Sequence, residues 1–241
     1  EIYVGANWYG RYLNFGNLQI LASGDPISNN GSGYNQEGWD WNHFPGTTAA
    51  VLPMKDLRAN VKNLDAESGY EEMLLSDETY AGSLSFQNKQ GIFAMKLHEN
   101  PKYNGSLRAR KSYFFFDNRV VALGSNICST LPGKPVNTTL FQVYLPKTDA
   151  PVGVNGEMIS AFPYSKRLEK GQNFVSDGLN NYFFVKQGNV QVTKSLQQSL
   201  DHETDKPTQN NFALAAIDHG ATPGNASYEY MVLVQPTDNE V

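Results

Sequence analysis

The chain has 241 residues, of which 40% are hydrophobic and 18% charged, and its formal net charge is −5 at pH 7. This composition argues against disorder, and the acidic balance excludes the general basic footprint of a protein that binds nucleic acid or an anionic membrane. The single cysteine, Cys128, excludes an internal disulfide and a cysteine-rich metal site, and its apolar neighbours predict a buried, inert thiol. No apolar run approaches the length of a transmembrane helix, and the first ten residues lack the pattern of a signal peptide.

Strand signals dominate from the N-terminus onward. Residues 11–21 alternate loosely between apolar and polar side chains and predict a strand, whereas residues 53–67 predict a short helix or turn. Residues 111–127 contain two β-rich runs around Asp117-Asn118, which predicts a hairpin. No other segment keeps a helical period for three turns.

The second half of the chain continues the same pattern. Residues 152–159 contain Asn155-Gly156, the strongest two-residue hairpin signal, and residues 181–195 predict another hairpin with Gln187-Gly188-Asn189 as its turn. Three further runs predict strands: "TTLFQVYL", "NFALAAIDH" and "SYEYMVLVQ". Many strands joined by Gly, Asn and Pro turns indicate an all-β sandwich or barrel, and we expect one domain over residues 1–241.

Two of the three tryptophans, Trp39 and Trp41, lie in "QEGWDWNHFPGTT". An exposed pair would stack on sugar rings, whereas a buried pair would anchor the core, and composition favours the core. In that interpretation Asp40 and Asn42 cap turn amides around Pro45-Gly46.

The charged side chains give weaker indications. The four histidines, His43, His98, His202 and His219, are scattered, and no pair has zinc-ligand spacing, so the sequence predicts no metal site. Arg108, Arg110 and Lys111 form a basic cluster that would suit an anionic polymer or, as the sequence favours, the solvated edge of a sheet.

Several long motifs resemble one enzyme family. They are "EIY" with "NWYGRY", "GYNQEGWDWNHFPGTTAAVLPMKDL", "ARKSYFFFDNRVVALGSNI", "KPTQNNFALAAIDHG" and "ASYEYMV". The chain is similar over nearly its whole length to polysaccharide lyases that cleave chondroitin, dermatan and hyaluronan, and most of all to the chondroitin sulfate ABC lyases. The resemblance implies a large antiparallel β super-sandwich of the galactose mutarotase-like type. It also implies that residues 1–241 are a fragment of a longer lyase, with a helical toroid before it and a small β domain after it.

The resemblance also implies a divided active site. In these lyases a His, a Tyr and an Arg come from the toroid, and a Glu at the start of the sandwich supports them. That glutamate corresponds to Glu1, which would orient and charge-balance its neighbours rather than act as the general base. Some relatives carry an asparagine three positions later, where this chain has Val4, so Asn7 or Arg11 is expected to replace it as a contact to the substrate. Glu37 is a weaker second candidate carboxylate.

The partners expected from the resemblance are a glycosaminoglycan and the toroid of the same protein. We expect no nucleic acid, no membrane and no cofactor in this domain, and a secreted or periplasmic bacterial location. One alternative is a non-catalytic glycan-binding module that uses Trp8, Trp39 or Trp41 with the cluster from Arg108 to Lys111. Another is a mutarotase-type sugar enzyme, which would need converging histidines and carboxylates that the sequence does not suggest.

Overall fold

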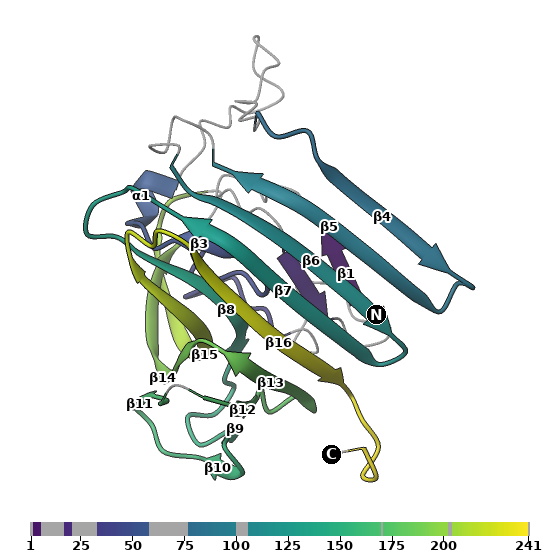
Figure 1. Cartoon of the computed structure of the whole chain (residues 1–241). Helices are drawn as coiled ribbons and strands as arrows, with labels where there is room; N and C mark the ends of the chain where they lie inside the picture. The colour runs from purple at the N-terminus through teal and green to yellow at the C-terminus, as the bar shows by residue number, and fades with distance from the viewer. Residues whose placement is uncertain are drawn as a thin grey trace.

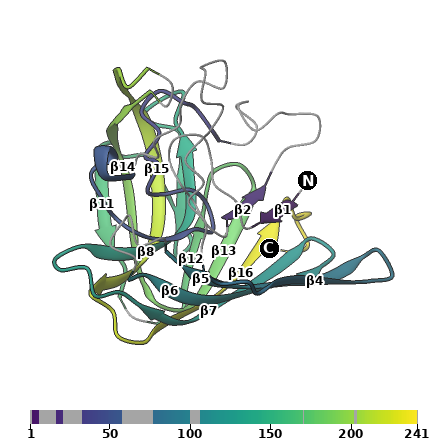
Figure 2. The same ribbon diagram turned by 90° about the horizontal axis from the view of Figure 1, so that it is seen from above.

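Two large antiparallel β-sheets face each other in the computed structural model (Figures 1 and 2). The structure describes residues 2–5, 17–20, 33–57, 77–99, 106–169, 171–201 and 204–240. Within these ranges the only helix is α1 (Met54–Leu57), and no helix is long and apolar enough to cross a membrane. The strands are β1 (Ile2–Gly5), β2 (Asn17–Ile20), β3 (Thr48–Ala50), β4 (Ala81–Phe86), β5 (Gln90–His98), β6 (Arg108–Phe116), β7 (Arg119–Cys128), β8 (Pro135–Tyr144), β9 (Val152–Val154), β10 (Glu157–Ile159), β11 (Tyr164–Arg167), β12 (Asn173–Ser176), β13 (Asn181–Gln187), β14 (Asn189–Leu200), β15 (Pro207–Ala221) and β16 (Ala226–Val234).

The larger sheet has nine strands in the order β10-β9-β12-β13-β16-β7-β6-β5-β4, and the smaller has five in the order β11-β14-β15-β8-β3. The strands β1 and β2 form a separate antiparallel pair in which Val4 lies opposite Leu18. In Figure 2, β4 and β5 reach well beyond the five-stranded sheet, so this end of the nine-stranded sheet overhangs the sandwich.

The main core fills the space between the two sheets. Small and β-branched side chains alternate along each strand with outward residues, which is the pattern of a half-buried sheet. The nine-stranded sheet contributes Val120, Ala122, Val175, Phe183, Val185 and Val232, and the five-stranded sheet contributes Val136, Leu140, Val190, Val192, Ala213, Ala215 and Ile217. The all-β sandwich expected from the sequence is confirmed.

Two predicted hairpins are confirmed in detail. Asp117 and Asn118 join β6 to β7, with Asp117 in the left-handed region at φ 53°. Asn155 and Gly156 join β9 to β10 with φ values of 50° and 87°. Positive φ at both central residues is the requirement of the tight turn that matches strand twist, and Asn-Gly meets it at little cost.

The predicted hairpin at Gln187-Gly188-Asn189 is wrong. The strand before it, β13, pairs with β12 and β16 in the nine-stranded sheet, whereas β14 pairs with β11 and β15 in the five-stranded sheet. Gly188 therefore carries the chain from one sheet to the other. Its φ is 139°, and a Cβ atom there would lie 2.4 Å from Cγ2 of the buried Ile217.

Two other expectations are met only in part. The predicted strand over residues 11–21 appears as β2 (Asn17–Ile20), and the predicted helix over residues 53–67 appears as α1 (Met54–Leu57); the remainder of each lies outside the described residues.

Cys128 is half-buried at the end of β7, so the expectation of a buried thiol is wrong.

The outer face of the nine-stranded sheet carries an apolar row. Its seven members lie directly opposite one another across seven neighbouring strands: Leu84, Ile92, Phe114, Val121, Met231, Phe184 and Phe174. None of them is buried, and Leu84 is 68% exposed. We call these residues the apolar row.

Replacement of Gly188 by alanine should destabilise the domain by about 1–3 kcal/mol, because the new methyl group enters the space of Ile217 at a strained backbone position. Gly82→Ala is the matched control, since a Cβ atom at Gly82 meets nothing within 4 Å. Urea unfolding of the two variants measures the difference. Equal stability would show that Gly188 does not constrain the crossing.

Candidate functional site

Most of the residues that the sequence placed in the active site lie outside the described residues. This holds for Glu1 and Arg11, and also for Asn7 and Trp8. What the structure does show is the segment of residues 36–48, here called the Trp segment, together with a pocket beside it and a polar cluster between the sheets.

The aromatic side chains of the Trp segment are packing anchors. Trp39 and Trp41 are 2% and 1% exposed, and Trp39 contacts the rings of Tyr34, Phe44 and Phe212 at centroid distances of 4.9, 5.8 and 5.9 Å. They form a second small core against the five-stranded sheet, on the side opposite the main core. The core interpretation is confirmed, and a glycan-binding module that uses Trp39 or Trp41 is excluded in this conformation.

Asp40 organises the polar side of the Trp segment. Its Oδ2 atom lies 2.8 Å from Nδ1 of His43, and its Oδ1 atom accepts hydrogen bonds of 2.9 Å from the backbone and side-chain nitrogens of Asn42. Burial alone would raise the pKa of Asp40, but the His43 ring and the Asn42 donors together hold this pKa below its ordinary value. Asp40 is therefore an acceptor in a fixed network.

The prediction that Asp40 and Asn42 cap turn amides around Pro45-Gly46 is wrong. Asn42 uses its side chain to bond the backbone nitrogen and oxygen of Leu52, at 2.9 and 3.0 Å, while the Gly46 nitrogen donates to the backbone oxygen of Thr139 at 2.8 Å. Asp40 and Asn42 do cap backbone groups, but these belong to Asn42 and Leu52.

Two glutamines from distant strands complete the network. Gln142 of β8 accepts from the Asp40 nitrogen and donates to the backbone oxygens of Asp40 and His43, over distances of 2.9 to 3.1 Å. Gln197 of β14 donates to Gln142 at 2.8 Å and to the backbone oxygen of Gly38 at 3.1 Å. The Trp segment is thus fixed to the two strands of the five-stranded sheet that lie on either side of β15. Glu37 is exposed at its start, and its backbone nitrogen bonds the Asn35 side chain.

An open pocket of about 730 Å³ lies beside this segment. It is lined by Pro53, Met54, Lys55, Gln198, Ser199, Leu200, Pro207, Thr208 and Gln209, from α1 and the facing ends of β14 and β15. The Trp segment supports its wall: the Gly38 nitrogen donates to Oγ1 of Thr208 at 3.0 Å, and Nε1 of Trp41 donates to the Leu200 oxygen at 3.4 Å. Amides, hydroxyls and one ammonium group suit a hydroxylated ligand with a negative charge. Sequence reasoning missed this pocket, because its walls come from segments about 150 residues apart.

The basic cluster is divided between the two faces of β6. Arg108 and Arg110 are exposed, whereas Lys111 is fully buried and points into the sandwich. β6 lies between β5 and β7, so the predicted sheet edge is wrong. The alternation Ala109, Lys111, Tyr113 could have indicated that Lys111 faces the core.

Lys111 belongs to a polar cluster between the sheets. Its Nζ atom donates to the backbone oxygen of Gly46, and the Tyr113 hydroxyl donates to the same oxygen at 3.2 Å. Nearby, Oγ1 of Thr138 is 2.8 Å from both Oγ1 of Thr48 and Nε2 of His219. Burial lowers the pKa of Lys111 to about 7 and that of His219 to about 4, so both are largely deprotonated in mildly alkaline solution.

The histidines in the described ranges serve structural contacts. His43 bonds Asp40, His219 bonds Thr138, and Nδ1 of His98 contacts Asp77, while His202 lies outside these ranges. Within the described part of the chain, no three His, Cys, Asp or Glu residues are grouped to hold a metal ion.

Comparison with known proteins identifies the family. The family model for the super-sandwich domain of polysaccharide lyase family 8 matches residues 1–241. The chain belongs to this family. The expected resemblance to chondroitin lyases is thereby confirmed.

Curated relatives support this membership along the whole chain. It is 41% identical over 241 residues to the chondroitin sulfate ABC exolyase of Proteus vulgaris, covering 100% of this chain and 24% of that protein. It is 43% identical over 235 residues to the chondroitin sulfate ABC exolyase of Bacteroides thetaiotaomicron, covering 97% of this chain and 22% of that protein. The chain thus spans about a quarter of the length of these lyases.

Solved structures support the fold. A chondroitinase AC lyase, solved in complexes with oligosaccharides, aligns with a TM-score of 0.70 and 23% identity over 99% of this chain and 34% of its own. A Paenibacillus xanthan lyase aligns with a TM-score of 0.65 and 21% identity over 96% of this family 8 chain and 26% of its own. The predicted super-sandwich is therefore confirmed.

Replacement of Trp41 by alanine should lower the free energy of unfolding by about 3–5 kcal/mol, because the change leaves a large cavity in the second core. The control is Phe86→Ala, whose ring is 59% exposed and should cost far less. Chemical denaturation measures both. Unchanged stability of the Trp41 variant would contradict its assignment as a packing anchor.

Lys111 should make stability rise with pH above neutrality. Its pKa is about 7 in the folded state and 10.5 when exposed, so between these values the unfolded chain binds the extra proton and a rise in pH favours folding. Lys111→Met should remove this dependence between pH 7 and 10. Unfolding free energies across that window provide the measurement, and parallel curves for wild type and variant would contradict the prediction.

Proposed function

We propose that this chain is the super-sandwich domain of a glycosaminoglycan lyase that cleaves chondroitin and dermatan sulfate by β-elimination. The observation that carries the proposal is the 41% and 43% identity, over nearly the whole chain, to two chondroitin sulfate ABC exolyases. The domain would form one wall of the substrate cleft, and the helical toroid of the same protein would form the other.

In the proposed reaction a base removes the C5 proton of the uronic acid. The C4–O bond breaks, the departing sugar oxygen takes up a proton, and a double bond forms between C4 and C5. The C5 proton is a weak acid, so the neighbouring carboxylate must be neutralised and the developing enolate stabilised. In this family-based proposal the Tyr, His and Arg of the toroid carry out proton transfer and charge stabilisation.

Glu1 is proposed as a positioning residue for that group. A carboxylate beside an Arg or His fixes its orientation and favours its charged form. Arg11 is proposed to hold a carboxylate or sulfate of the substrate, because a guanidinium group can bond such groups through two parallel hydrogen bonds. No cofactor is proposed for this domain, and the proposed location is secreted or periplasmic, where a large anionic polymer is accessible.

Glu1→Gln in the full-length protein should lower kcat/KM by roughly ten- to a hundredfold, a typical loss for a supporting group, while the melting temperature stays the same. Loss of the negative charge should also move the acidic limb of the pH profile to lower pH, because the neighbouring histidine loses a partner that favours its charged form. Ultraviolet absorbance of the unsaturated uronate product measures the rate.

Glu37→Gln is the matched control, since Glu37 is the exposed carboxylate that the sequence offered as a second candidate. It should leave both the rate and the pH profile unchanged. Loss of activity in the Glu37 variant alone would reverse the assignment. Absence of unsaturated product from the wild-type full-length protein would overturn the proposed function.

A further inference from the structure

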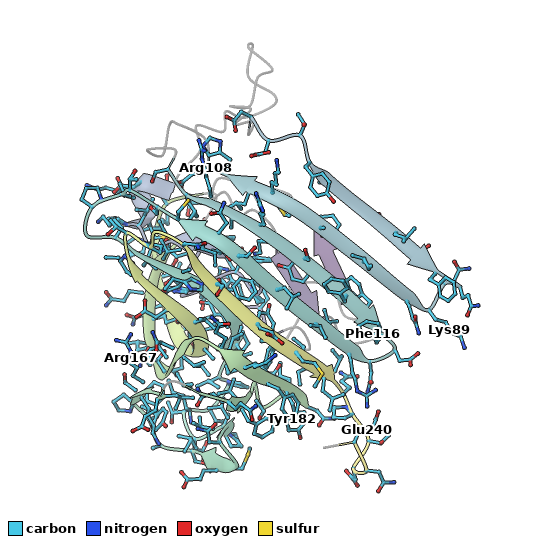
Figure 3. The ribbon with its side chains drawn as sticks, viewed as in Figure 1. Lys89, Arg108, Phe116, Arg167, Tyr182 and Glu240 are labelled. Carbon is cyan, nitrogen blue, oxygen red and sulfur yellow. The ribbon has the colours of Figure 1, made fainter. Side chains whose placement is uncertain are left out.

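Two exposed arginines lie in the interior of the nine-stranded sheet rather than at its edge. Arg108 and Arg110 project from the outer face of β6, which pairs with β5 on one side and β7 on the other. Figure 3 shows Arg108 at the upper end of this strand. Charges at a sheet edge prevent unwanted pairing, but a strand with two partners has no such need. The arginines therefore require another explanation.

A third cation, Lys96, lies beside the two arginines, and carboxylates lie near this end of β5 as well: Glu78 pairs with Lys96, and Asp77 contacts His98, which lies opposite Arg108. Lys96 of β5 lies directly opposite Arg110, an arrangement of like charges that weakens a sheet. Nζ of Lys96 is 3.5 Å from Glu78, but neither Arg108 nor Arg110 forms an ion pair with any residue in the described ranges. This concentration of cations, here called the arginine patch (Lys96, Arg108 and Arg110), occurs in a chain of net charge −5.

The outer side of β6 changes from cationic to aromatic along its length. After the two arginines come Ser112, Phe114 and Phe116, all on the same face because side chains alternate along a strand. Phe114 is a member of the apolar row, and Phe116 is 44% exposed. Outward side chains repeat about every 7 Å, so this surface extends roughly 27 Å from Arg108 to Phe116.

A sulfated polysaccharide has the chemistry that fits such a strip. Its sulfate groups can accept paired hydrogen bonds from arginine, and the apolar faces of its sugar rings can pack on phenylalanine. We propose that the arginine patch, with Phe114 and Phe116, forms a binding surface for a sulfated glycan chain. This inference rests on the proposed function for the class of polymer, and it gives the outer face of the sheet a role in holding that polymer.

The test uses the full-length protein and dextran sulfate, a sulfated polymer without uronic acid that β-elimination cannot cleave. Arg108→Ala/Arg110→Ala should weaken binding roughly tenfold, because two charge-assisted contacts at an exposed site are lost. Lys147→Ala/Lys166→Ala is the control, since it removes the same charge from two exposed residues elsewhere and should leave the affinity unchanged. Arg108→Lys/Arg110→Lys should restore part of the affinity.

Equal binding by wild type and the Arg108/Arg110 variant, with equal melting temperatures, would overturn the inference. So would an equal loss in the lysine control, which would indicate net charge alone, or tighter binding of double-stranded DNA than of the glycan. The experiment distinguishes failure of the glycan-binding proposal from failure of the proposed lyase function. Normal product formation with undiminished binding refutes only the arginine patch, whereas patch-dependent binding without unsaturated product refutes only the lyase function.

Discussion

The backbone oxygen of Gly46 connects the two sheets of this domain. It accepts hydrogen bonds from Lys111 and Tyr113, which both project inward from β6 of the nine-stranded sheet. Gly46 itself ends the turn that leads into β3 of the five-stranded sheet. Its nitrogen donates to the backbone oxygen of Thr139 on the neighbouring strand β8. A buried amine is costly to leave without a partner, so these contacts constrain where the Trp segment enters the sandwich. The position of that segment then determines the second core and the pocket wall.

The network of hydrogen bonds around Asp40 holds the rest of the Trp segment in place against the five-stranded sheet. Each backbone polar group of a loop that runs over a sheet must find a partner, and here side chains of Gln142, Gln197 and Asn42 provide many of them. Satisfied polar networks of this kind specify one arrangement, because any shift would leave several buried groups unpaired. Such rigidity would serve the proposed role as one wall of a polymer-binding cleft, since the positions of substrate contacts are then fixed before binding.

Local signals in the sequence were sufficient for much of the fold. Asn155-Gly156 specifies its turn through backbone conformation alone, and the alternating runs in β15 and β16 specify strands. The crossing at Gly188 could not be read in this way, because a glycine between two β-rich runs also suits a hairpin; the deciding factor is the pairing of β14 with β15 and β11. The candidate site could be predicted from the sequence even less well than the fold. Glu1 and Arg11 came from family resemblance, whereas the Gln142 contacts join residues about 100 positions apart.

The outer faces of the two sheets differ in whether another segment of the chain covers them. This difference bears on where a binding surface can lie. The Trp segment covers part of the outer side of the five-stranded sheet and buries Phe212 there. The outer side of the nine-stranded sheet leaves its apolar row partly accessible, and beside it lie Arg108 and Arg110, which form no ion pair with any described residue. A row of partly accessible apolar side chains across seven strands is more extensive than single scattered surface hydrophobics, and the like charges of Lys96 and Arg110, which lie opposite each other beside it, disfavour the sheet. Both features disfavour the isolated sheet, and the proposed contact with a ligand that has both anionic groups and apolar surfaces accounts for their occurrence together on one face.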